Sequence, residues 1–153
     1  MPEPPFDLAR AHRWFAVECN NAAWDLVESP TRQAEDVAQM IHAAHAAWFH
    51  WKQVGTAVNE LRAECLLATA YIAADDPAAA SRHADRCQAL SDQLGDEQST
   101  FDRATAWGCV AAAHRLSGDM DRANHAREKA RSYVEELKDS QDQAVFEKLY
   151  PAF

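Results

Sequence analysis

The sequence contains few residues that would interrupt a helix. Among its 153 residues there are only four glycines and six prolines. Val and Ile, which favour strands, are also scarce, whereas Ala, the strongest helix former, is abundant. This composition predicts an all-α fold and leaves no segment for a sheet.

Long apolar runs and an export signal are lacking too. The longest uncharged apolar run is about CLLATAYIAA, which is far shorter than the roughly 20 residues of a membrane-spanning helix. The N-terminus, MPEPPFD, has neither the basic residues nor the apolar core of a signal peptide. We therefore expect a cytoplasmic protein with no membrane partner, in which residues 1–5 are flexible.

Basic clusters are missing as well. The chain carries 15 Lys and Arg against 24 Asp and Glu, which gives a formal net charge of −9. Because an acidic chain repels phosphate groups, we expect no nucleic-acid partner. The same charge is compatible with a basic partner segment.

The familiar motifs of catalysis and cofactor binding are not found. There is no GxSxG, no HExxH and no glycine-rich phosphate loop. No two of the four cysteines, Cys19, Cys65, Cys87 and Cys109, lie within twenty residues of each other, which excludes CxxC motifs. We therefore assign no catalytic residue and no cofactor, and we interpret the cysteines as small buried apolar side chains.

Residues that start and stop helices divide the chain into segments. Ser29 with Pro30 and Asp76 with Pro77 are typical of helix starts, while Gly55, Gly95 and Gly118 are typical of helix ends. The predicted helices are residues 7–28, 30–53, 57–74, 77–94, 100–117, 120–138 and 141–149. Because the loops are short, neighbouring helices must run antiparallel within one domain, residues 1–153.

Two of the helical pairs have similar sequences. When LLATAYIAADDPAAASRHADRCQAL is aligned with CVAAAHRLSGDMDRANHAREKARSY, Ala68 matches Ala111 and Ala80 matches Ala123 at a constant offset of 43 residues. Trp107, Ala111, Ala123 and Ala130 also occupy the aromatic and small positions of a known repeat. Over residues 57–138 the chain therefore resembles the tetratricopeptide repeat (TPR), although its repeat is longer than the usual 34 residues.

The resemblance implies a stack of antiparallel hairpins, wound as a right-handed array, with a concave groove that binds a protein or peptide. A capping helix and tail, residues 141–153, would then cover the open end of the stack. The groove positions of the family correspond here to Arg62, Thr69, Thr105 and Arg115. The function that we expect is a non-catalytic interaction module, and a homodimer formed through an open face is a variant of it.

Three further side chains are expected to have structural roles. Gly108 is the one glycine inside a predicted helix, and we expect it to permit a close helix contact. Glu64 lies on an otherwise apolar side of its helix, so we expect an ion pair there, with Arg62, Arg115 or a histidine as its partner. His114 occupies the position of a repeat tyrosine, which indicates a packed histidine.

The stretch HAAHAAWFHW, residues 42–51, raises a second hypothesis. Its tryptophans fall on the apolar stripe of their helix and are interpreted as core residues. His42 and His45 lie three residues apart on one side of the helix, a spacing that permits both to bind one metal ion. A metal-binding bundle, or an enzyme that uses this pair, is therefore one alternative to the interaction module.

A third hypothesis is a small-molecule pocket between the first two helices. Trp24 and Trp48 would line it together with other tryptophans of these helices. Asn21, on the line formed by Trp14, Val17 and Trp24, would supply its polar anchor. An amide on an apolar stripe needs hydrogen-bond partners, and a tie between two helices satisfies it equally well.

Overall fold

The protein is described here by a computed structural model of residues 4–151, and these residues form helices and no strand. The helices are α1 (Leu8–Val27), α2 (Ala34–Val54), α3 (Ala57–Ala73), α4 (Pro77–Leu94), α5 (Thr100–Ser117), α6 (Met120–Glu136) and α7 (Ser140–Leu149). A 3₁₀ turn, Gly95–Glu97, precedes α5. The all-α prediction is confirmed. The outermost parts of the predicted flexible N-terminus and tail, residues 1–3 and 152–153, lie outside the described residues.

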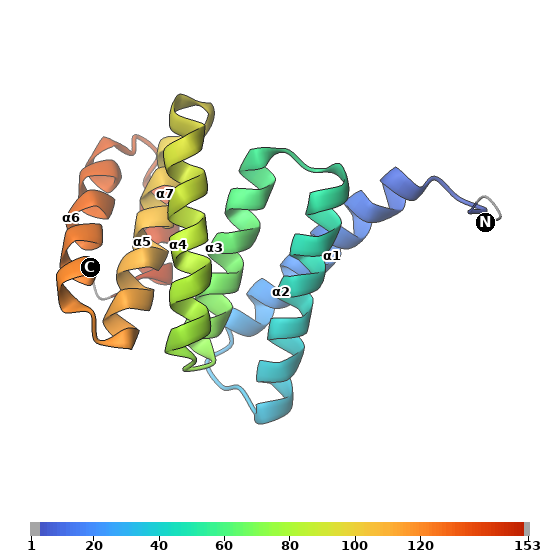
Figure 1. The fold of residues 1–153 in the computed structure, drawn as a ribbon, viewed down its shortest axis with the longest axis horizontal. Coiled ribbons are helices and arrows are strands. Elements are labelled where there is room, and N and C mark those ends of the chain that lie inside the picture. Colours follow the sequence, from blue (N-terminus) through green and yellow to red (C-terminus); the bar gives the residue numbers. More distant parts are fainter. Residues whose placement is uncertain (1–3, 152–153) are drawn as a thin grey trace.

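Six helices pair into three hairpins that stand side by side (Figure 1). The pairs are α1 with α2, α3 with α4, and α5 with α6. The first helices of the hairpins, α1, α3 and α5, also contact one another along the stack. We call the surface formed by these three helices the inner face. Within residues 4–151, no helix is both long and apolar enough to cross a membrane.

Alanine residues at the helix contacts let the two helices of a hairpin pack closely. The repeat positions Ala68, Ala80, Ala111 and Ala123 are all buried, with exposed fractions between 0 and 5%. Side chains this small let antiparallel helices pack with little space between their backbones. The small residues of the repeat pattern therefore lie at the helix contacts, as a helical-repeat arrangement requires.

The second helix begins later than the sequence predicts. Instead of starting at Pro30, α2 starts at Ala34, and Gln33 is its N-cap. The intervening loop is held by Arg32, whose Nη1 donates to the carbonyl oxygens of Leu26, Val27 and Ser29 at 3.1, 2.7 and 2.8 Å. Because the last carbonyls of a helix have no partner within the helix, this guanidinium satisfies the end of α1 and ties the loop to it.

The first helix is also rotated relative to the prediction. Its buried residues are Ala16 and Ala23, both 0% exposed, and they face a helix that buries Ala44 and Ala47. By contrast, Trp14 and Val17 on the predicted apolar line are 59% and 40% exposed. A close α1–α2 contact requires small side chains, and the alanine stripe supplies them.

The last helix lies on the inner face rather than over the end of the stack. It contacts α5, and in Figure 1 it lies behind that helix. Its Lys148 Nζ lies 2.6 Å from Oε2 of Glu28, which caps the C-terminal end of α1. The predicted short C-terminal helix is confirmed, and it packs against α5.

Gly108 explains how α7 approaches so closely. A Cβ atom at this position would lie 2.7 Å from Cδ2 and from Cε2 of Tyr150, and 3.0 Å from Cε2 of Phe146. Both aromatic side chains are buried, at 4% and 2% exposed. The prediction that Gly108 permits a close helix contact is therefore confirmed.

Candidate functional site

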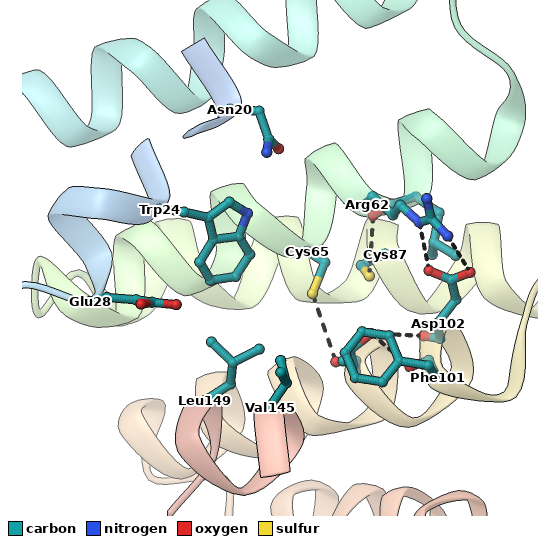
Figure 2. A pocket seen from close by; sticks show the side chains of 12 residues that line it. Asn20, Trp24, Glu28, Arg62, Cys65, Cys87, Phe101, Asp102, Val145 and Leu149 are labelled. Atoms are coloured by element: carbon teal, nitrogen blue, oxygen red, sulfur yellow. Dashed lines mark hydrogen bonds and ion pairs between the residues drawn. The ribbon is translucent and has the colours of Figure 1, made fainter. Parts of the chain in front are cut away.

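The inner face contains a pocket of about 310 Å³ between α1, α3, α5 and α7 (Figure 2). We call it the first pocket. Its wall is mainly apolar and includes Trp24 of α1, Leu61 of α3, Phe101 of α5 and Leu149 of α7. Asn20, Glu28 and Thr105 contribute polar atoms, so the pocket offers an apolar volume with a few directional groups.

An ion pair borders the first pocket. Nε and Nη2 of Arg62 donate to Oδ1 and Oδ2 of Asp102 at 2.7 and 3.0 Å. Asp102 is 4% exposed, and its Oδ2 also accepts from Oγ of Ser99 at 2.8 Å. Although burial raises the pKa of Asp102, the hydrogen bonds from Arg62 and Ser99 bring it below its usual value. This carboxylate is therefore ionised and fixed, and it fixes Arg62 in turn.

Three thiols lie beside the same pocket. Cys65 of α3 and Cys87 of α4 line it, and Cys109 of α5 lies next to them. Their Sγ atoms are within 4.8 Å of one another, and no other His, Cys, Asp or Glu group of three or more within residues 4–151 is this close. We call these residues the thiol cluster. They are the side chains most able to hold a metal or metalloid.

The pKa of each thiol in the cluster depends on the other two thiols. Hydrogen bonds from Cys109 and Cys87 lower the pKa of Cys65, whereas those to Cys65 and Cys87 raise the pKa of Cys109. For Cys87, the bond from Cys109 lowers the pKa, but the bond to Cys65 and burial together raise it. Burial also raises the pKa of Tyr150, whose hydroxyl lies 3.6 Å from Sγ of Cys65. The pKa of Cys65 is thus lowered, whereas the pKa values of Cys87 and Cys109 are raised.

A second pocket, of about 220 Å³, lies beyond α7, at the edge of the inner face where α5 meets α6. Arg115, Asn124 and Arg127 line it. Leu149 lines both pockets, so the C-terminal helix separates them. The inner face is therefore a groove that α7 divides in two.

The four predicted groove residues are placed differently from one another. Arg62 and Thr105 both line the first pocket, and Arg115 lines the second. Thr69 is 7% exposed and its Oγ1 donates to the carbonyl oxygen of Cys65 at 2.8 Å, so it serves its own helix. Three of the four therefore reach a pocket of the inner face.

The residues of the predicted tryptophan pocket do not come together. Trp24 lines the first pocket, but with Asn20 beside it, while Asn21 is exposed. Trp48 instead donates from Nε1 to Oε1 of Glu64 at 2.9 Å. The rotation of α1 described above is the reason, because it turns Asn20 rather than Asn21 inward.

Glu64 is at the centre of a polar cluster between α2, α3 and α4. It is 1% exposed, and its Oε2 lies 2.7 Å from Nδ1 of His83 while its Oε1 lies 3.1 Å from Nε of Arg86. The predicted ion pair at Glu64 is confirmed, with a histidine among its partners. Three side chains, those of Trp48, His83 and Arg86, thus satisfy this carboxylate, and it has a structural role between the helices.

The pair His42 and His45 gains no third ligand within the described residues. His45 Nε2 instead lies 2.9 Å from the hydroxyl of Tyr71, and its ring lies 5.7 Å from that of His83. Burial, followed by the nearby His83, lowers the pKa of His45. His45 is thus tied to Tyr71 by its hydrogen bond, and His42 is exposed.

His114 is packed, as its repeat position predicts. It is 2% exposed, and its Nε2 lies 3.0 Å from Oδ1 of Asp85. This contact ties α5 to α4.

The sequence contained a signal for the thiol cluster that motif spacing does not detect. Cys65 and Cys87 lie eleven residues on either side of Asp76, and Cys87 and Cys109 lie eleven residues on either side of Gln98. Asp76 and Gln98 are in the loops between α3 and α4 and between α4 and α5. In antiparallel helices, residues equidistant from the connecting loop lie at the same level. Equal distance from a loop, rather than CxxC, therefore indicates such a cluster.

Aromatic side chains also gather on the outside of the first hairpin. Trp14, Phe15 and Phe49 are 59%, 46% and 52% exposed. Ring contacts connect them through His50, which lies 5.5 Å from Phe15 and 5.4 Å from Phe49 between ring centroids. We call this set the aromatic patch. Exposed apolar surface that is contiguous marks interaction sites in soluble proteins.

Comparisons with models of known families, with curated proteins and with solved structures find no match to the chain. The structure shows a helical-repeat-like arrangement, and the resemblance to tetratricopeptide repeats is one of residue pattern.

Proposed function

We propose that the chain is a non-catalytic binding module of the tetratricopeptide type, which takes up a segment of a partner protein on its inner face. The observation that carries the proposal is that this face already holds a helix. The chain's own α7 lies there between two pockets, and its Phe146 and Tyr150 pack against Gly108. A groove that accepts an amphipathic helix is a common mode of peptide recognition.

The two pockets differ in the chemistry that they accept. The first pocket is lined by Trp24, Leu61, Phe101 and Leu149, so it suits an apolar side chain. Its arginine is already paired with Asp102. The second pocket presents Arg115 and Arg127, and within residues 4–151 neither has a carboxylate partner. We therefore expect a partner segment that carries an apolar residue near an acidic one, because guanidinium groups bind carboxylates in pairs of hydrogen bonds.

A peptide selection tests this function. The wild-type chain would be used to select binders from a displayed random-peptide library, and the peptides recovered would be measured on variants. Val145→Trp fills the first pocket, and Arg115→Glu reverses the charge of the second. Both are expected to weaken binding by at least about tenfold, equivalent to about 1.4 kcal/mol.

Matched controls separate the pockets from general effects. Ala144→Trp adds the same side chain at an exposed neighbouring position of α7, and Arg131→Glu makes the same charge change on an exposed position of α6. These controls are expected to bind within about twofold of wild type, because surface substitutions away from a contact change energies little. Failure to select any peptide, or equal loss in controls and pocket variants, contradicts the proposal.

A small molecule is a second candidate ligand, favoured by the size of the first pocket. About 310 Å³ is at the lower end of the range of ligand sites, which are mostly apolar with a few polar groups. Fragments screened by NMR would shift the Trp24 indole signal in the wild type but not in Val145→Trp. Fragment binding without any peptide binding would favour this candidate over the peptide.

A second copy of the chain is the partner that the aromatic patch favours. The patch lies on the first hairpin, which has a neighbouring hairpin on one side only (Figure 1). Because a two-fold dimer places the same patch on both partners, an apolar patch is complementary to itself. This contact leaves the inner face available.

A further inference from the structure

The thiol cluster is a set of ligands built from three separate helices. Cys65, Cys87 and Cys109 belong to α3, α4 and α5, and their exposed fractions are 8%, 0% and 0%. All three are free thiols whose Sγ atoms lie within 4.8 Å of one another. Bonds of about 2.3 Å to a common centre would place three sulfurs about 4 Å apart around a planar centre and about 3.5 Å apart around a pyramidal one. The cluster therefore has to contract by roughly 1 Å to close on a bound atom.

The surroundings of the cluster are neutral or negative. Sγ of Cys87 lies 3.7 Å from the carbonyl oxygen of Leu61, and Sγ of Cys109 lies 3.1 Å from that of Ala106. The two carboxylates that act on the thiols, Asp102 on Cys65 and Glu64 on Cys87, are each paired with an arginine, Arg62 and Arg86, so no unpaired cation among the described residues is left to balance the thiolates. A bound species must therefore compensate the thiolate charges by itself.

The first pocket provides the route to the cluster. Cys65 and Cys87 line this pocket, and the side chain of Arg62 at its border is 59% exposed to solvent (Figure 2). A small molecule that enters the pocket thus meets Cys65, which is 8% exposed, whereas Cys87 and Cys109 are buried and become accessible only when the pocket wall moves.

The net charge of the complex with three thiolates distinguishes between the thiophilic species that could bind the cluster. Three thiolates leave a net charge of −2 around Cu⁺ and −1 around Zn²⁺, and zinc further prefers a fourth ligand. No fourth His, Cys, Asp or Glu ligand lies within the cluster among residues 4–151. A trivalent centre leaves no net charge, which matters because an uncompensated charge in a buried apolar site is costly.

We propose that Cys65, Cys87 and Cys109 form a three-thiolate site for a trivalent metalloid of the arsenite class, reached through the first pocket. Arsenite is the uncharged acid As(OH)₃ near neutral pH, so it crosses the apolar pocket without carrying charge. Three As–S bonds form while three As–O bonds break, and each hydroxyl leaves with a thiol proton as water. Arsenic stays trivalent, and no electron is transferred.

The test uses the reduced wild-type chain and sodium arsenite under anaerobic conditions. The number of thiols that react with a disulfide reagent in denaturant is expected to fall from four to one at one equivalent of arsenite, if the reagent is applied faster than arsenic dissociates. X-ray absorption of the complex is expected to show three sulfur neighbours around arsenic. A loss of only two thiols, or of none, would overturn the proposal, and this readout requires no variant to fold.

Two substitutions and two competitors sharpen the test. Cys19→Ser, on α1 and outside the cluster, is the control that should retain one equivalent of arsenite. Cys109→Ala should weaken binding by at least about 100-fold, the upper range for losing even a supporting group around a metal ligand. Equimolar Zn²⁺ or Cu⁺ should not displace the arsenic. Displacement by either cation, or unchanged binding in Cys109→Ala, would refute the assignment.

Discussion

Gly108→Ala tests the position of α7, on which the two-pocket groove depends. In an ordinary helix this substitution stabilises the protein by about 1 kcal/mol, because alanine is the better helix former. Here the new Cβ would lie 2.7 Å from two carbon atoms of Tyr150 and 3.0 Å from one of Phe146. Attractive carbon contacts begin near 3.5 Å, so one backbone or both rings must move by nearly 1 Å.

The cost of this movement exceeds the helix gain. Overpacking a core position costs about 1–3 kcal/mol, and here the rings are 4% and 2% exposed with little room to turn. We therefore expect Gly108→Ala to lower the free energy of unfolding by about 1 kcal/mol net of the propensity gain. For a chain of this size the melting temperature would fall by about 2–4 °C. Urea denaturation followed by circular dichroism measures the difference.

A matched background separates the steric clash from other causes. In a Phe146→Ala, Tyr150→Ala chain the clashing ring atoms are absent, so Gly108→Ala should become stabilising by up to about 1 kcal/mol. The sign of the effect therefore reverses between the two backgrounds. A stabilising Gly108→Ala in the wild type, or the same loss in both backgrounds, would refute the placement of α7.

Three further substitutions follow from individual contacts. Asp102→Asn should reduce the free energy of unfolding at pH 7 and weaken its dependence on acid pH. A carboxyl whose folded pKa is lowered stabilises the protein fully above about pH 4 and loses that contribution as the pH falls through the folded pKa. Chemical denaturation from pH 2 to pH 7 measures both effects, and a pH profile identical to that of the wild type contradicts the account. Arg32→Ala should lower the free energy of unfolding by about 2 kcal/mol, because three carbonyl oxygens at and just beyond the end of α1 lose a charged donor. A decrease below about 0.5 kcal/mol, as at ordinary surface sites, would show that this contact is unimportant. Sedimentation should show a dimer in the wild type and a monomer in a Trp14→Ser, Phe15→Ser variant, whereas a wild-type monomer excludes the aromatic patch as a self-contact.

Much of the fold follows from local sequence signals. Asp76 with Pro77 and Ser99 start α4 and α5 where the sequence places them, and Gly118 ends α5 in the left-handed conformation that glycine favours. These signals act within a few residues of themselves, so they can be interpreted without knowledge of the neighbours. Glu64 and Gly108 were also predictable, because each breaks the apolar or helical pattern around it.

Features that depend on contacts between distant segments were not predictable in the same way. Pro30 looks like a helix start, but Arg32 binds the preceding helix and delays α2 by four residues. The apolar line through Trp14 suggests a buried face, yet a close α1–α2 contact selects the alanines instead. Nothing in the sequence of α7 indicates that its aromatic side chains lie against Gly108, because that contact depends on how the whole stack is arranged.

The candidate site likewise combines residues that local sequence patterns predict with residues that only the three-dimensional arrangement brings there. Arg62 and Thr105 were identified from the repeat phase and line one pocket, whereas Asp102 and Val145 enter it only through the three-dimensional arrangement. The thiol cluster was missed because the interpretation of the cysteines considered spacing along one helix. Their equal distances from two loops become meaningful only once the helices are known to be antiparallel neighbours.

The central claim is that the inner face of α1, α3 and α5 is the surface that binds a partner. The most direct test is the NMR footprint of a peptide selected by the wild-type chain. The account predicts that the largest shift changes fall on residues of the two pockets, including Trp24, Thr105 and Arg115. Shift changes confined to α2 and α4, or to the aromatic patch, would contradict it.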